Sequence, residues 1–148
     1  MKFGKTLIMA SLGWMLLQAP ALADNDRPVN FNQLPANAQT LIKKHFGNYK
    51  FVKAEVERED GGLKYEVELS HDISIEFNKN GKWKEIDCEK TVVPFQLIPQ
   101  PVRRHVKKNY PNATIVKIER DHKKFEVELS NDVEITYDKN GKFLKVDK

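Results

Sequence analysis

The chain has 148 residues, a formal net charge of +4, 31% charged residues and a single cysteine. Lys2 and Lys5 stand in a leader that we expect to be removed, so the remaining chain carries a formal charge of +2. Roughly 125 residues can bury one core, but this nearly neutral chain lacks the basic character of a nucleic-acid-binding protein, and one cysteine cannot form an internal disulfide.

Residues 1–23 have the pattern of a secretory signal peptide. The two lysines precede an apolar stretch from Leu7 to Leu17, and the segment ends on Ala21-Leu22-Ala23. The apolar stretch of about 11 residues is about half as long as a membrane-spanning helix, which argues against the alternative of a membrane anchor. We therefore predict cleavage before Asp24 and a periplasmic or secreted product with no stable membrane insertion.

The rest of the chain consists of two similar halves, which we predict to be repeats at 24–89 and 90–148. The phrase KNGKW at 79–83 returns as KNGKF at 139–143, and about half of the preceding strand-like sequence is identical as well. The first half has a longer turn around Gly61-Gly62. Such similarity at a fixed spacing is typical of a duplicated supersecondary unit.

Each half begins with an amphipathic helix. Pro35 and Pro99 stand where a helix can begin without losing a needed hydrogen bond. Apolar residues then recur at helical spacing until Gly47 and Pro111 end the pattern.

Four short strands follow each helix. Val52, Ala54 and Val56 alternate with charged residues, and three further stretches in each half have the same period of two. The Asn-Gly pairs at 80–81 and 140–141 predict two-residue type I′ hairpin turns. The sequence thus predicts an α+β fold, in which two tandem α-β-β-β-β units form one antiparallel sheet of about eight strands with two helices on one face. The expected core contains Val52, Val67, Leu69, Ile75, Phe77, Val116, Val127, Leu129 and Ile135, covered by Leu41, Ile42, Val102 and Val106.

The motifs resemble those of the PepSY-like, beta-lactamase-inhibitor-like family. The helix after LP or IP, the closing DKNGKxxxVD pattern and the leader carry the resemblance, which covers nearly all of the mature chain. It implies an exported protein of the kind found mainly in Bacteroidetes-type bacteria, with tandem units whose concave sheet clamps a partner protein. It implies no catalytic residue, and the lone Cys88 departs from the two intradomain disulfides of the inhibitor itself.

The sequence contains no pattern of residues that favours catalysis or metal binding. The four histidines lack metal-ligand spacing, and Cys88 has no evident histidine partner. Asp138, Asn140 and Asp147 partly match a calcium loop, but Thr136 stands at the first ligand position and the flanks read as strands, which favours a hairpin. We predict no enzyme activity, no cofactor and no metal site, and we favour burial of Cys88 over an unpaired reactive thiol.

The candidate partner-binding surface is the solvent-facing side of the sheet. The candidate residues are Trp83, Phe143, Glu66, Glu68, Glu126 and Glu128. The four glutamates recur at equivalent positions, and a period of two places both aromatic residues on the same side. One interpretation is a solvated face on which Lys53 and Lys117 balance the acids; the other is an acidic surface that attracts a basic partner.

We expect an exported, non-enzymatic binding module that recognises a protein or peptide through its open sheet face. Inhibition of an envelope hydrolase or protease is a narrower form of this hypothesis. The alternative is a structural or stress-related envelope protein that binds a small ligand or a surface polymer. We expect a monomer, with a Cys88-linked dimer as an alternative, and an unidentified envelope protein or peptide as the partner.

Overall fold

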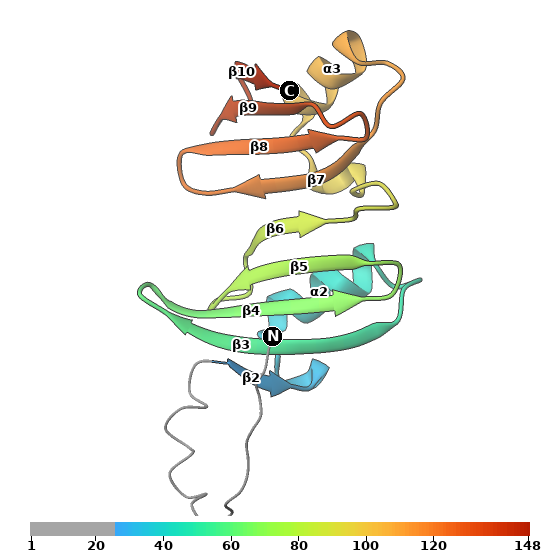
Figure 1. The fold of residues 1–148 in the computed structure, drawn as a ribbon. Helices are drawn as coiled ribbons and strands as arrows, with labels where there is room; N and C mark the ends of the chain where they lie inside the picture. The colour runs from blue at the N-terminus through green and yellow to red at the C-terminus, as the bar shows by residue number, and fades with distance from the viewer. Residues whose placement is uncertain (1–25) are drawn as a thin grey trace, which may run out of the picture.

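The computed structural model describes residues 26–148, so the predicted signal peptide lies outside the described residues. Nine strands form one antiparallel sheet in the order β10-β9-β8-β7-β6-β5-β4-β3-β2, and both α-helices lie on one side of it (Figure 1). The predicted α+β fold with a single sheet and two helices is confirmed. Within 26–148, no helix has the length and apolar character needed to cross a membrane.

Each α-helix is followed by four strands, so the same order of elements occurs twice. The first half contains β2 (Asp26–Val29), the 3-10 helix η2 (Phe31–Gln33), α2 (Ala36–His45), β3 (Phe51–Glu59), β4 (Gly62–Leu69), β5 (Ile73–Asn78) and β6 (Trp83–Asp87). The second half contains η3 (Phe95–Leu97), α3 (Gln100–Asn109), β7 (Ile115–Arg120), β8 (Lys124–Leu129), β9 (Glu134–Asp138) and β10 (Phe143–Asp147).

Strand β2 is the element that the sequence pattern does not predict. Its four residues, DRPV, show no alternation of apolar and polar side chains. They pair with β3 through Arg27↔Val56 and Val29↔Ala54, so β2 covers one edge of the sheet. This strand explains why the sheet has nine strands instead of about eight.

The KNGK hairpins exist, but their turns are not the predicted type I′. The Gly81 N–H donates to the Asn78 carbonyl at 2.9 Å, and the Asn78 N–H donates to the Lys82 carbonyl at 2.9 Å. Gly81 has φ 83°, whereas Asn80 keeps a negative φ. The connection is therefore a type I turn followed by a left-handed glycine, with three residues in the loop. The Asn78 Oδ1 accepts the N–H groups of Asn80 and Lys82, which holds Asn80 out of the left-handed region.

Each hairpin tip packs against the start of an α-helix. A Cβ added to Gly81 would lie 2.9 Å from Pro35 Cβ, and one added to Gly141 would lie 3.0 Å from Pro101 Cβ. The Asn37 Nδ2 also donates to the Asn80 carbonyl at 3.2 Å. The glycines thus allow both the left-handed backbone and the close approach of the helix, which is a physical reason for the repeated phrase.

The core lies between the sheet and the two helices, and most of its predicted members are buried. Ten are buried: Ile42, Val67, Leu69, Ile75, Phe77, Val102, Val106, Val127, Leu129 and Ile135. Leu41 and Val116 are half-buried. The prediction for Val52 is wrong, because its side chain is 58% exposed. The pairing of β3 with β4 shifts between Phe51 and Lys53, and the bulge turns Val52 to the open face.

Bulges beside Trp83 and Phe143 place both aromatic candidate residues on a different face from the predicted one. Trp83 pairs with Phe77, the register then shifts, and Trp83 is only 4% exposed on the helix-covered side. Phe143 pairs with Tyr137, a matching irregularity follows it, and its ring stacks on that of His105 with ring centroids 4.8 Å apart. The prediction that Trp83 and Phe143 lie on the open face is wrong, because the extra residue after each KNGK turn reverses the alternation.

Candidate functional site

A row of glutamates crosses the open face of the sheet. It consists of Glu55 on β3, Glu66 on β4, Glu76 on β5, Glu85 on β6, Glu119 on β7 and Glu126 on β8. We call this set the glutamate row, since each member is the direct register partner of the next. The residues beside the row, such as Val67, Ile75 and Ile118, are buried under the helices, so the row faces away from them.

The glutamate row places like charges directly opposite one another at five successive strand contacts. Side chains in this relation have Cβ atoms about 4.5–5.5 Å apart, and like charges there reduce stability. The row also crosses from β6 to β7, where the two halves of the chain meet. On β9 and β10 the same line continues as Thr136 and Lys145, so the acidic part ends at Glu126.

The protonation of the central carboxyl groups reflects their surroundings. Partial burial, followed by the carboxylates of Glu85, Glu59 and Glu66, raises the pKa of Glu76, although Lys64 opposes this. Partial burial likewise raises the pKa of Glu85, with a further contribution from Glu119 and an opposing one from Lys117. Both groups are therefore harder to ionise than an isolated glutamate, which is the expected effect of burial and adjacent like charges.

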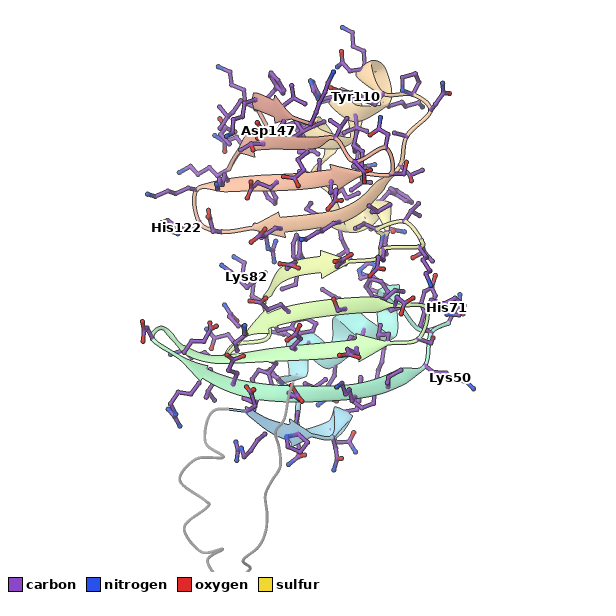
Figure 2. All side chains as sticks on the ribbon, viewed as in Figure 1. Lys50, His71, Lys82, Tyr110, His122 and Asp147 are labelled. Carbon is purple, nitrogen blue, oxygen red and sulfur yellow. The ribbon has the colours of Figure 1, made fainter. Side chains whose placement is uncertain are left out.

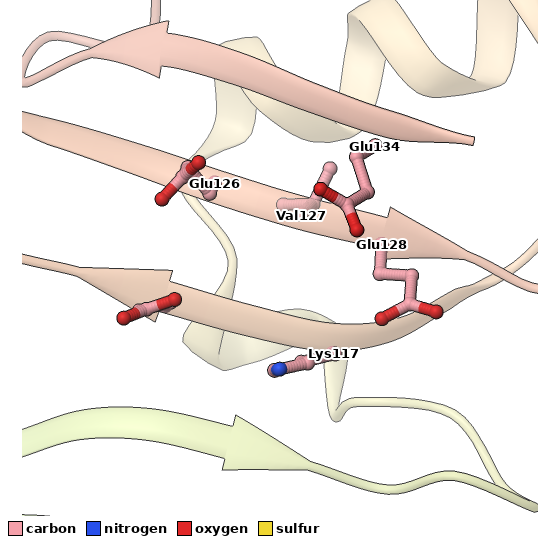
Figure 3. A pocket seen from close by; sticks show the side chains of 6 residues that line it. Lys117, Glu126, Val127, Glu128 and Glu134 are labelled. Carbon is pink, nitrogen blue, oxygen red and sulfur yellow. The ribbon is translucent and has the colours of Figure 1, made fainter. Parts of the chain in front are cut away.

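A second line of side chains runs beside the glutamate row and is mixed in charge. It consists of Lys53, Glu68, Ser74, Asp87, Lys117, Glu128, Glu134 and Asp147. Figure 3 shows part of it, with Lys117, Glu128 and Glu134 on the face that also carries Glu126. The two lysines expected to balance the acids are thus present on this face.

These lysines balance only part of the negative charge. Lys53 Nζ lies 3.8 Å from Glu68 Oε2, and Lys117 Nζ lies 3.7 Å from Glu85 Oε2. Both distances exceed those of tight charged hydrogen bonds, so neither pair neutralises its carboxylate as fully as a close contact would. Within residues 26–148, Glu66 and Glu119 form no ion pair, so the middle of the row stays negatively charged.

The open face has shallow hollows lined mainly by polar side chains. One of about 60 Å³ lies among Lys117, Glu119, Glu126 and Glu128. Another of about 410 Å³ lies where β4 ends and β5 begins, and its lining includes Glu68, Asp72 and Glu89. Pockets for small molecules are typically about 300–1,000 Å³ and mostly apolar. The first hollow is therefore too small, and the lining of the second is too polar.

The structure brings only some of the predicted site residues together. Glu66 and Glu126 belong to the glutamate row, and Glu68 and Glu128 belong to the mixed line beside it. Trp83 and Phe143 lie on the other face, so the reason for including them no longer holds. Sequence reasoning missed four row members, namely Glu55, Glu76, Glu85 and Glu119. The period of two places each on the open face, but only the strand register shows that they adjoin.

The nucleophilic and metal-binding candidates occupy structural positions. Burial raises the pKa of the fully enclosed Cys88 thiol to about 11, so it is protonated at neutral pH. His105 Nδ1 lies 2.8 Å from the Tyr137 hydroxyl. Burial, and to a smaller extent the nearby charge of Lys108, lowers the pKa of His105. The Asp138 Oδ1 accepts the N–H groups of residues 140 and 142 within its hairpin. Among the residues that the structure describes, no three His, Cys, Asp or Glu side chains are grouped as metal ligands.

The comparison with protein families matches residues 21–76 and 63–145 to the model described as "Putative beta-lactamase-inhibitor-like, PepSY-like". The chain belongs to this family. The family resemblance seen in the sequence is thereby confirmed. No curated protein is similar enough to count as a match.

Solved structures from two Bacteroides species have the same fold. One, from Bacteroides thetaiotaomicron, is described as a "putative calcium-regulated periplasmic protein"; it has 40% identity and a TM-score of 0.82, covering 85% of this chain and 99% of its own. A second, from Bacteroides vulgatus, is described as a "putative periplasmic protein from DUF2874 family", with 39% identity, a TM-score of 0.81 and coverage of 85% and 99%. A third, also from Bacteroides vulgatus, is described as a "putative periplasmic protein of unknown function", with 37% identity, a TM-score of 0.80 and coverage of 84% and 100%. These descriptions support a periplasmic location for the family members.

Proposed function

We propose that this protein is a periplasmic, non-enzymatic binding module whose open sheet face binds a basic protein or peptide. The observation that carries the proposal is the glutamate row, which continues across six adjacent strands and both halves of the chain. The periplasmic location rests on the leader-like residues 1–23 and on the descriptions of the similar structures.

The glutamate row costs the folded protein stability. Directly opposed like charges reduce stability, and the three contacts among Glu66, Glu76, Glu85 and Glu119 have this geometry. Adjacent strands lie about 4.8 Å apart, so the row extends about 24 Å, well beyond a Debye length of about 8 Å at physiological salt. A field of one sign over that distance attracts a cationic partner and favours a bound state in which lysines or arginines separate the carboxylates.

The shape of the surface favours a macromolecular partner over a small ligand. The hollow of about 410 Å³ on this face is acidic and the smaller one holds about 60 Å³. A flat charged surface suits a peptide segment or a protein patch, whereas small ligands usually occupy concave apolar pockets. If the bound protein is an envelope hydrolase or protease, coverage of its surface would inhibit it.

The test measures binding of a lysine peptide of about ten residues to the mature chain, residues 24–148, by calorimetry. The row variant combines Glu66→Gln, Glu76→Gln and Glu119→Gln. We expect it to weaken binding at least tenfold while the protein stays folded, since like charges are removed. Raising the salt concentration should also weaken wild-type binding, because it screens exposed charges.

The row variant without Glu76→Gln is compared with a matched control that removes two charges from exposed turn residues outside the row and the acidic hollow: Asp60→Asn and Asp132→Asn. The control should bind the peptide almost as well as wild type. Equal losses in both variants would show that only net charge matters, and unchanged binding by the row variant would refute the proposal. A pull-down from the native periplasm with the wild type and both variants would then identify the natural partner.

Calcium regulation is a second candidate function, favoured by the description of the Bacteroides thetaiotaomicron structure. Carboxylate oxygens are the ligands that Ca²⁺ prefers, and the glutamate row carries them on adjacent strands. No three of these side chains are grouped as metal ligands in residues 26–148, so calcium would have to draw them together on binding. The KNG hairpins fit this role less well, because Asp138 Oδ1 already accepts two backbone N–H groups. Calorimetry with calcium chloride tests this candidate. Heat that disappears in the row variant supports it, whereas no heat refutes it without affecting the peptide test.

A further inference from the structure

Strand β10 is an open edge of the sheet. It pairs with β9 on one side, and no other described residue pairs with its outer side. All five of its residues, Phe143–Asp147, are exposed, including Leu144 at 54% and Val146 at 39%. Figure 2 shows Asp147 on this outermost strand. A strand edge with free N–H and C=O groups is a template for pairing with another strand.

The pairing of β6 with β7 in the middle of the same sheet shows which strand sequence fits against such an edge. Strand β6 follows the first KNGK hairpin as β10 follows the second, and the outer side of β6 is paired with β7. In that pairing Ile86 lies opposite Ile118, and Asp87 lies opposite Lys117.

The direction of the free backbone groups on β10 follows from this comparison. The Cys88 N–H donates to the Val116 carbonyl of β7 at 2.8 Å. In an antiparallel pair every second residue bonds to the same neighbour, so the N–H and C=O of Ile86 face β7 too. The shared hairpin motif aligns Ile86 with Val146. The N–H and C=O of Val146 therefore point outward.

We propose that β10 pairs with β10 of a second copy of this chain, antiparallel and about a two-fold axis at Val146. In this register Val146 lies opposite Val146, as Ile86 lies opposite Ile118 within one chain. Lys145 of each copy lies opposite Asp147 of the other, which repeats the Asp87↔Lys117 contact twice. The sequence around Val146 is thus complementary to itself in charge and in apolar character.

A β10-to-β10 contact between two copies suits this edge better than a head-to-tail contact between β10 and β2. The other edge of the sheet is β2, where Pro28 lacks an N–H group and interrupts strand pairing. Repeated β10-to-β2 contacts would also build an open fibre, whereas the β10-to-β10 contact closes on itself. In the closed dimer the two open faces lie on the same side, so two glutamate rows share one continuous surface. The proposed dimer differs from the monomer expected from the sequence, and the experiments below distinguish the two.

The first test is a charge exchange followed by sedimentation equilibrium of the mature chain from about 5 to about 500 µM. Lys145→Asp places two aspartates opposite each other, and Asp147→Lys places two lysines opposite each other. Each single variant should raise the dimer dissociation constant about tenfold or more, and the double variant should restore it to within about threefold. Wild type that stays monomeric throughout, or a double variant as weak as the singles, would overturn the proposal.

The second test uses cysteine crosslinking. In the proposed register the two copies of Val146 face each other within the 4.4–6.8 Å Cα separation that a disulfide needs. Val146→Cys should therefore form a covalent dimer on mild oxidation. Leu144→Cys is the control, since the two copies of that residue would lie about 13 Å apart along the strands. Equal crosslinking of both variants, or none by Val146→Cys in a folded protein, contradicts the register.

Discussion

Replacing Glu76 by glutamine should stabilise the protein, because this residue has like-charged neighbours on both sides. Glu76 lies on β5, and its direct register partners are Glu66 on β4 and Glu85 on β6. Each opposed pair of like charges costs about 0.2–1 kcal/mol, and the lost attraction to partly exposed Lys64 offsets part of the gain. We expect Glu76→Gln to gain about 0.5–1.5 kcal/mol of unfolding free energy at pH 7, or about 2–6 °C in Tm.

The gain should depend on pH in a defined direction. Partial burial and neighbouring carboxylates raise the pKa of Glu76 in the folded state above its ordinary value of 4.5. The folded protein therefore binds more protons than the unfolded chain in this range, and wild type loses stability as the pH rises from 4.5 through the raised pKa. Glutamine cannot ionise, so the advantage of the variant should be small at pH 4 and complete at pH 7.

Urea unfolding followed by circular dichroism at pH 4 and pH 7 measures both effects. Glu59→Gln is the control, because Glu59 Oε2 lies 3.1 Å from Lys64 Nζ and its neutralisation removes an attraction. The control should lose up to about 1 kcal/mol at pH 7 instead of gaining stability. A Glu76→Gln protein that is less stable than wild type at pH 7, or equally stabilised at both pH values, would refute the reasoning.

Three substitutions and one labelling reaction test the packing. Trp83→Ser should cost about 3–5 kcal/mol in urea unfolding because Trp83 is 4% exposed, whereas Phe143→Ser, at a side chain 43% exposed, should cost less than half as much; similar costs would contradict the assigned burial. Gly81→Ala should cost more than about 1 kcal/mol and lower the Tm, because its φ of 83° is unfavourable for alanine and the new Cβ would lie 2.9 Å from Pro35; an unchanged Tm would show that the tip can move away. Cys88 should react with a thiol reagent at pH 8 only at the rate of unfolding, since its thiol is enclosed and burial raises its pKa to about 11, and rapid labelling of the native protein would show an open site.

The sequence alone determined the local structure of this protein, because local structure depends on nearby residues. A period of two identified the strands, helical spacing identified α2 and α3, and the repeated KNGK phrase located two hairpins. The family was also visible at this level. The turn type was mistaken because Asn-Gly fits both a two-residue and a three-residue hairpin, and the choice depends on the Asn78 side chain and on the packing of Gly81 against Pro35.

The tertiary structure decided which of these residues face each other. Single-residue bulges turned Trp83 into the core and Val52 out of it, and a bulge reverses every subsequent side chain on a strand although it barely changes the sequence pattern. The glutamate row likewise depends on the register at five successive strand contacts, one of which, β6 with β7, joins the two halves of the chain. Strand register is set by long-range packing of the buried face, so a charged line on the opposite face emerges only when the whole sheet has assembled.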